Sequence, residues 1–204
     1  MRDSPAETGL PAGTPILTPR GERPIEEIGA GTLVIAVSGS AAPFQQVQAV
    51  RRHRTATGLV RIRAGALAVG APLEDLILAP GHGVFLNGRL VAAGALALGP
   101  GITVEAAAPC DLFELVLAGH DAVLAAGAAV ETARPEAADA PFCPRAEPDG
   151  VLRAMLAWRA EEMGWVAPAA PVEPAPEVGS LRERLAASPF LPAIPPDPVL
   201  RGSD

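Results

Sequence analysis

The apolar positions in the first two thirds of the chain form short runs that Gly and Pro residues separate. Such runs lie at residues 15–18, 32–37, 60–63, 75–78, 84–86, 112–117 and 122–125. Residues 60–63 alternate apolar and basic side chains, a period of two that is typical of a half-buried strand. Many short strands with frequent turns indicate an all-β fold rather than crossover units. We therefore predict a mainly β domain over residues 9–132.

Two local patterns refine this prediction. Asn87 and Gly88 separate two apolar runs, which predicts a two-residue hairpin turn with positive φ at both positions. Residues 44–55 predict one long exposed strand, and residues 51–54 form the one basic cluster of the chain. Charged side chains commonly protect an edge strand from pairing, although a partner-binding patch is the alternative.

After residue 132 the pattern changes. Residues 133–148 are rich in Ala, Pro and acidic side chains and predict a linker, and residues 149–164 predict a helix that Asp149 caps and Gly164 ends. Residues 165–204 predict a Pro-rich, partly disordered tail with a short helix at 181–187. The first helix carries an apolar stripe made of Val151, Leu152, Met155, Leu156, Trp158 and Met163.

This stripe requires a surface to cover. We expect the helix to dock on the β domain; the alternative is that it presents Trp158 and Trp165 to another protein. A protein partner bound through the helix or the tail is therefore one expectation for this chain.

Composition excludes several classes of partner. The net charge of −7 and the pI near 5.0 disfavour binding to nucleic acid, as do the 3% of aromatic residues and the absence of Tyr. The longest apolar stretches, 90–98 and 122–130, are too short and too broken by Gly to cross a membrane. Residues 1–7 contain no apolar run typical of a targeting segment, so we expect a cytoplasmic protein, with export by an unconventional route left open.

The chain offers few metal ligands. Cys110 and Cys143 are too far apart for a structural zinc site, and the three histidines, His53, His82 and His120, lack close spacing. We expect no metal and no cofactor, and by default two unpaired thiols, although a disulfide between the cysteines stays possible.

Four sequence blocks occur together in order. The first spans residues 9–28 and includes Gly-Thr at 13–14 and Thr-Pro-Arg-Gly at 18–21; the others lie at 60–67, at 75–82 followed by Asn-Gly, and at 119–127. Together they resemble the Hint (Hedgehog/intein) family, most closely its bacterial stand-alone branch. The resemblance implies a horseshoe-type all-β fold and self-cleavage through an acyl shift onto a thiol or hydroxyl.

The same resemblance assigns the candidate site residues. Gly9 stands where the family has its attacking Cys, and Ala79 stands where the family commonly has a hydroxyl residue. His82 matches the histidine that polarises the scissile amide and protonates its nitrogen. The later pair of family histidines is here Glu114 and His120, so His120 is the expected support for His82.

Three hypotheses follow. The first is a degenerate Hint domain that no longer cleaves itself and persists as a folded interaction module. The second is a residually active domain that uses Thr8 or water as nucleophile and His82 as acid, with Asp121 orienting His120. The third is an unrelated β-rich binding protein. Splicing is not expected, because the only Asn of the chain lies in the predicted turn.

Overall fold

The computed structural model describes residues 7–37, 43–136 and 141–165. Contacts divide the chain into the units Met1–Ala167 and Pro168–Asp204, so every described residue belongs to the first unit. The predicted short helix at 181–187 and the tail beyond residue 165 lie outside the described residues.

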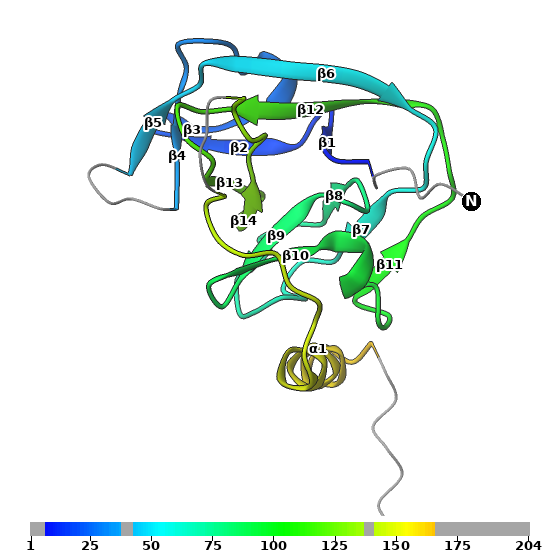
Figure 1. Cartoon of the computed structure of the whole chain (residues 1–204). Helices are drawn as coiled ribbons and strands as arrows, with labels where there is room; N and C mark the ends of the chain where they lie inside the picture. Colours follow the sequence, from blue (N-terminus) through cyan, green and yellow to red (C-terminus); the bar gives the residue numbers. More distant parts are fainter. Residues whose placement is uncertain (1–6, 38–42, 137–140, 166–204) are drawn as a thin grey trace, which may run out of the picture. The chain divides into compact units, whose positions relative to one another are not determined.

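The described residues are mainly β, with one α-helix near their C-terminal end (Figure 1). The strands are β1 (Leu10–Pro11), β2 (Pro15–Thr18), β3 (Gly21–Pro24), β4 (Leu33–Ile35), β5 (Phe44–Gln46), β6 (Ala49–Thr55), β7 (Val60–Ile62), β8 (Leu76–Leu78), β9 (Gly83–Leu86), β10 (Arg89–Ala92), β11 (Ile102–Val104), β12 (Cys110–Val116), β13 (Ala122–Ala125) and β14 (Ala128–Glu131). Two 3₁₀ turns lie at Ile25–Glu27 and Ala93–Leu96, and the helix α1 is Gly150–Glu162. The predicted all-β class with a C-terminal helix is confirmed.

The strands form four sheets within this part of the chain. The largest has the order β10-β9-β14-β13-β2-β3, and the others are β1-β12-β6, β11-β7-β8 and β4-β5. The long strands β6 and β12 run side by side along the top of Figure 1, in a register that pairs Thr55 with Cys110 and Ala49 with Val116. Because β12 lies between β1 and β6, it pairs with the N-terminal strand on one side and with β6 on the other.

The predicted hairpin is present between β9 and β10. Asn87 has φ of 49° and Gly88 has φ of 79°, as a two-residue turn of this kind requires. The single long strand predicted over residues 44–55 is wrong in one respect, because the strand is interrupted at Val47 and Gln48. Val47 is 1% exposed and its backbone bonds to Gly31 and Thr32 next to β4, whereas the N–H of Gln48 donates to the carbonyl of Val116 in β12. The pairing partner therefore changes from β4 to β12 at this point, which divides the predicted strand into β5 and β6.

Helix α1 lies against the β domain. The carboxylate of Asp149 accepts a hydrogen bond of 2.8 Å from the backbone N–H of Leu152, which caps the first turn. Leu152 and Leu156 join the hydrophobic core. Trp165 packs on the domain as well, since the guanidinium of Arg63 stacks 4.5 Å from its ring centre. Trp158 instead is 57% exposed, so only one of the two tryptophans is available to a partner.

No helix within the described ranges has the length and hydropathy needed to span a membrane.

Candidate functional site

The segment of residues 7–9 lies between strand β12 and the turn that joins β8 to β9. The backbone N–H of Gly81 donates to the carbonyl of Glu7 at 2.8 Å, and that of Ala79 donates to the carbonyl of Gly9 at 2.9 Å. On the other side, β1 continues the segment and pairs with β12. The peptide bond between Thr8 and Gly9 is therefore held in place from both directions.

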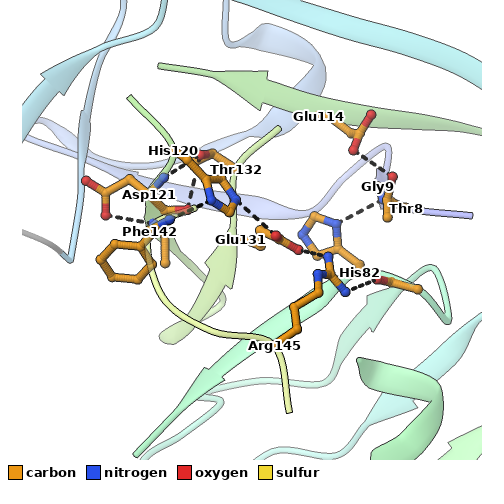
Figure 2. A network of polar contacts seen from close by, with 12 residues as sticks. Thr8, Gly9, His82, Glu114, His120, Asp121, Glu131, Thr132, Phe142 and Arg145 are labelled. Carbon is orange, nitrogen blue, oxygen red and sulfur yellow. Dashed lines mark hydrogen bonds and ion pairs between the residues drawn. The ribbon is translucent and has the colours of Figure 1, made fainter. Parts of the chain in front are cut away.

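His82 contacts this bond directly. Its side chain is 2% exposed, and its Nδ1 accepts a hydrogen bond of 3.0 Å from the backbone N–H of Gly9 (Figure 2). Burial, and to a smaller extent the positive charge of Arg145, lowers the pKa of His82 to about 3. The imidazole is thus neutral at pH 7 and carries its proton on Nε2, which is buried and has no hydrogen-bond partner among the described residues.

Gly9 occupies a conformation and a space that suit glycine alone. Its φ is +123°, a value that residues with a side chain rarely adopt. A Cβ atom at this position would lie 2.9 Å from the Cβ of Leu112 and 3.3 Å from the carbonyl oxygen of Phe113. Residue 9 therefore lacks a nucleophile and also lacks the room for one.

The hydroxyl of Thr8 could in principle start an acyl shift, but it is already hydrogen-bonded to another side chain. Its Oγ1 donates to the Oε1 of Glu114 at 2.7 Å. An acyl shift onto Thr8 would break the bond between Glu7 and Thr8 and release the nitrogen of Thr8. The imidazole of His82 instead contacts the nitrogen of Gly9. The hydroxyl and the imidazole therefore serve two different peptide bonds.

His120 is buried near this site but does not touch the bond. Its Nδ1 accepts from the backbone N–H of Phe142 at 2.8 Å, and its Nε2 lies 2.9 Å from the Oε1 of Glu131 (Figure 2). Both ring nitrogens are thus occupied, and neither bonds to Gly9 or His82. Among the described residues, Glu131 links His120 to the site.

Asp121 lies in the turn before β13. Its carboxylate accepts from the backbone N–H of Ala122 at 2.7 Å and from the side chain of Gln45 at 3.1 Å. The carboxylate that contacts the imidazole of His120 belongs to Glu131. Asp121 therefore braces the turn before β13, and the orientation of His120 comes from Glu131 and Phe142.

A cavity of about 250 Å³ opens beside Thr8. His82 and two carboxylates, those of Glu114 and Glu131, line it together with the three guanidinium side chains of Arg51, Arg134 and Arg145. The cavity is large enough to hold water beside Thr8 and His82.

Sequence reasoning missed Glu131 and Arg145. Glu131 ion-pairs with Arg145, and the Nη1 of Arg145 donates to the carbonyl of Gly81, immediately before His82, at 3.1 Å. The only sequence signal for Glu131 is that this charged residue directly follows the apolar run 128–130. Nothing in the sequence around Arg145 indicates that it reaches the site.

The described residues contain no group of His, Cys, Asp and Glu side chains suited to hold a metal ion. Cys110 and Cys143 are both free thiols in the structure.

Comparisons with known proteins identify the family of this chain. The family model described as Hint domain matches residues 8–137. Similar solved structures include a bacterial intein-like domain from Clostridium thermocellum, at 22% identity and a TM-score of 0.46 over 63% of this chain and 100% of that one. A DnaB intein from Synechocystis sp. is 11% identical, with a TM-score of 0.49 over 62% and 99% of the two chains. The gp41-1 intein is 14% identical, with a TM-score of 0.45 over 61% and 98%. No curated protein matches the chain.

Proposed function

The chain belongs to the Hint domain family, and on that premise we propose that it is a self-processing domain silenced at its first chemical step and kept as a folded interaction module. The first step of such processing needs a thiol or hydroxyl on the residue that follows the scissile bond. In this chain that residue is Gly9.

One observation carries the proposal. The imidazole of His82 contacts the amide nitrogen that would leave, 3.0 Å away, yet Gly9 has no attacking atom and no space for a side chain. The low pKa of His82 acts in the same direction, because a neutral imidazole carries its one proton on Nε2, whereas the nitrogen that faces Gly9 is the unprotonated Nδ1. Residue 9 therefore lacks an attacking group, and at neutral pH the imidazole presents no proton to the leaving nitrogen.

The helix supports a role in binding another protein. Val151 and Trp158 are 76% and 57% exposed and lie seven residues apart, which places them on one face of α1. This face differs from the one that Leu152 and Leu156 bury, from which it is turned by roughly 130° around the helix axis. We propose that a protein partner docks on the face formed by Val151 and Trp158.

Intact mass spectrometry tests the silencing. The full chain, produced with an N-terminal extension, is incubated with and without added thiol, and we expect its mass to stay constant. Loss of all residues before Gly9 would contradict the proposal if His82→Ala abolished that loss. The His82→Ala control separates self-cleavage from contaminating protease, which does not depend on the imidazole.

Hydrolysis by water is the second candidate, and the cavity beside Thr8 favours it. Water would attack the carbonyl carbon of Thr8 and give up a proton to Glu114, and the Gly9 nitrogen would leave with a proton from His82, yielding a Thr8 carboxylate and a free Gly9 amine. Because this step needs a protonated His82, its rate should rise as the pH falls below 7; because it also needs an ionised carboxylate as base, the rate should pass through a maximum at acid pH. Incubation at decreasing pH, with Glu114→Gln as the matched variant, tests it by intact mass; equal hydrolysis in both proteins would exclude this mechanism.

A further inference from the structure

The segment of residues 141–148 lies beyond the region that the family model matches, which ends at residue 137. It nevertheless packs along strand β10, because the N–H of Leu90 donates to the carbonyl of Pro144 and the N–H of Ala146 donates to that of Leu90. These two bonds, of 3.0 and 2.9 Å, fix the backbone of Arg145 opposite Leu90 in a parallel bridge. The position of Arg145 is therefore set by main-chain pairing, not by its own side chain.

The guanidinium of Arg145 joins two elements of the site. Its Nη1 donates to the carbonyl of Gly81, and its Nη2 ion-pairs with Glu131, which is 10% exposed and bonds through its other oxygen to His120 (Figure 2). A chain of polar contacts thus runs from His120 through Glu131 and Arg145 to the residue immediately before His82.

The turn that carries His82 lies directly on Glu131. A Cβ atom added to Gly83 would come within 2.5 Å of the Oε2 of Glu131 and 3.1 Å of its Cβ. Gly83 follows His82, and Gly81 precedes it. Glu131 and Arg145 therefore fix the backbone on both sides of the imidazole.

We propose that Arg145 is a positioning residue for His82: it fastens the carbonyl of Gly81 to Glu131 and so keeps the imidazole in hydrogen-bonding contact with the amide of Gly9. The inference rests on the proposed function only in taking the contact between His82 and Gly9 as the functional geometry. It assigns a role in the site to a segment outside the region that the family model matches.

Arg145 also acts on the pKa of His82 through its charge, and this effect can be separated from its hydrogen bond to Gly81. The charged groups that line the cavity with His82 come from several elements: Arg51 from β6, Glu114 from β12, Glu131 from β14, and Arg134 and Arg145 from the chain after β14. Of these, the charge of Arg145 is the one that lowers the pKa of His82. Lysine keeps a positive charge but cannot present two donors in a planar fork, so Arg145→Lys tests fastening with the charge retained.

The experiment measures hydrogen exchange at the Gly9 amide and the pKa of His82 by NMR, on the full chain. In Arg145→Gln we expect exchange at Gly9 to accelerate by about tenfold or more, as expected when a hydrogen bond to a charged group is lost, and the pKa of His82 to rise. In Arg145→Lys we expect faster exchange with a pKa of His82 that stays low. Arg51→Gln, which removes another guanidinium from the same cavity, should change neither.

Three results would overturn the proposal. The first is unchanged exchange at Gly9 in folded Arg145→Gln and Arg145→Lys. The second is an acceleration at Gly9 in Arg51→Gln that equals the one in Arg145→Gln. The third is an acceleration shared by all core amides, which would mean only a general loss of stability. If Arg145→Gln does not fold, Arg145→Lys decides by the same readout. Cleavage of the wild-type chain, seen by intact mass, would refute silencing, whereas unchanged exchange at Gly9 in uncleaved Arg145 variants would refute the positioning role, so the two proposals fail by different measurements.

Discussion

The backbone N–H of Gly9 donates a hydrogen bond of 3.0 Å to the Nδ1 of His82, across 73 positions of the sequence. This contact places an imidazole on the nitrogen that a peptide-bond cleavage would release. The residue that supplies the N–H has no side chain with which to begin that cleavage. Under the proposed function, the residues that position the bond are present and the attacking side chain is absent, so the two parts can be tested separately.

The first prediction concerns the space around Gly9. We expect Gly9→Ala to destabilise the protein by about 1–3 kcal/mol, because any Cβ is strained at φ of +123° and lies 2.9 Å from the Cβ of Leu112. Gly9→Cys should be destabilised to a similar degree and should not recover thiol-dependent cleavage, since its backbone must shift to hold a side chain. Denaturant unfolding and intact mass measure the two effects.

Gly99→Ala is the matched control for this prediction. A Cβ at Gly99 meets no atom within 4 Å, and its φ does not lie in the left-handed region, so we expect a change within about 0.5 kcal/mol. The prediction is wrong if Gly9→Cys is as stable as the wild type and cleaves itself when thiol is added. In that case the absence of a thiol at residue 9 would by itself explain a lack of self-cleavage.

The sequence could predict the strands and His82 but not the residues that hold His82 in place. Short apolar runs and a turn such as that at Asn87 are local features, and a sequence pattern records them directly. Arg145 reaches the site because its backbone pairs with Leu90, 55 positions earlier. Glu131 contributes to the site because the turn around His82 packs on its side chain. Long-range pairing of this kind leaves no periodic trace, and the break of the predicted strand at Val47 has the same origin.

The second prediction concerns acid stability. The pKa of His82 is about 3 in the folded protein and near 6.5 when the side chain is exposed to water, so between these values the unfolded chain binds a proton that the folded chain does not. The free energy of unfolding should therefore be highest above pH 6.5 and fall as the pH decreases toward 3. Replacement of His82 by Gln, which does not titrate, should flatten this dependence.

Between about pH 6.5 and pH 5 the carboxylates with a lowered pKa, those of Glu7, Asp75 and Asp111, stay ionised, so the difference between the wild type and His82→Gln reports the imidazole. Denaturant unfolding across that interval measures the slope, with His53→Gln on the edge strand β6 as the control. Equal slopes in the wild type and in His82→Gln would show that the buried imidazole is not the group responsible.

The third prediction concerns the attachment of α1. Arg159 is 6% exposed, and its Nε and Nη2 both donate to the carbonyl of Gly65, at 3.0 and 2.8 Å, so one guanidinium fork ties the helix to the β domain. We expect Arg159→Lys to lower the free energy of unfolding by about 1.5 kcal/mol, because an ammonium cannot reproduce the paired donors and its hydration is lost on burial. Arg153→Lys, on the same helix with a single contact to the carbonyl of Pro148, should change it by less than about 0.5 kcal/mol. Denaturant unfolding gives both values, and limited trypsin digestion should cut the helix of Arg159→Lys faster than that of Arg153→Lys.

Equal stabilities and equal digestion rates would mean that the apolar contacts of Leu152 and Leu156 hold the helix without the paired hydrogen bonds of Arg159.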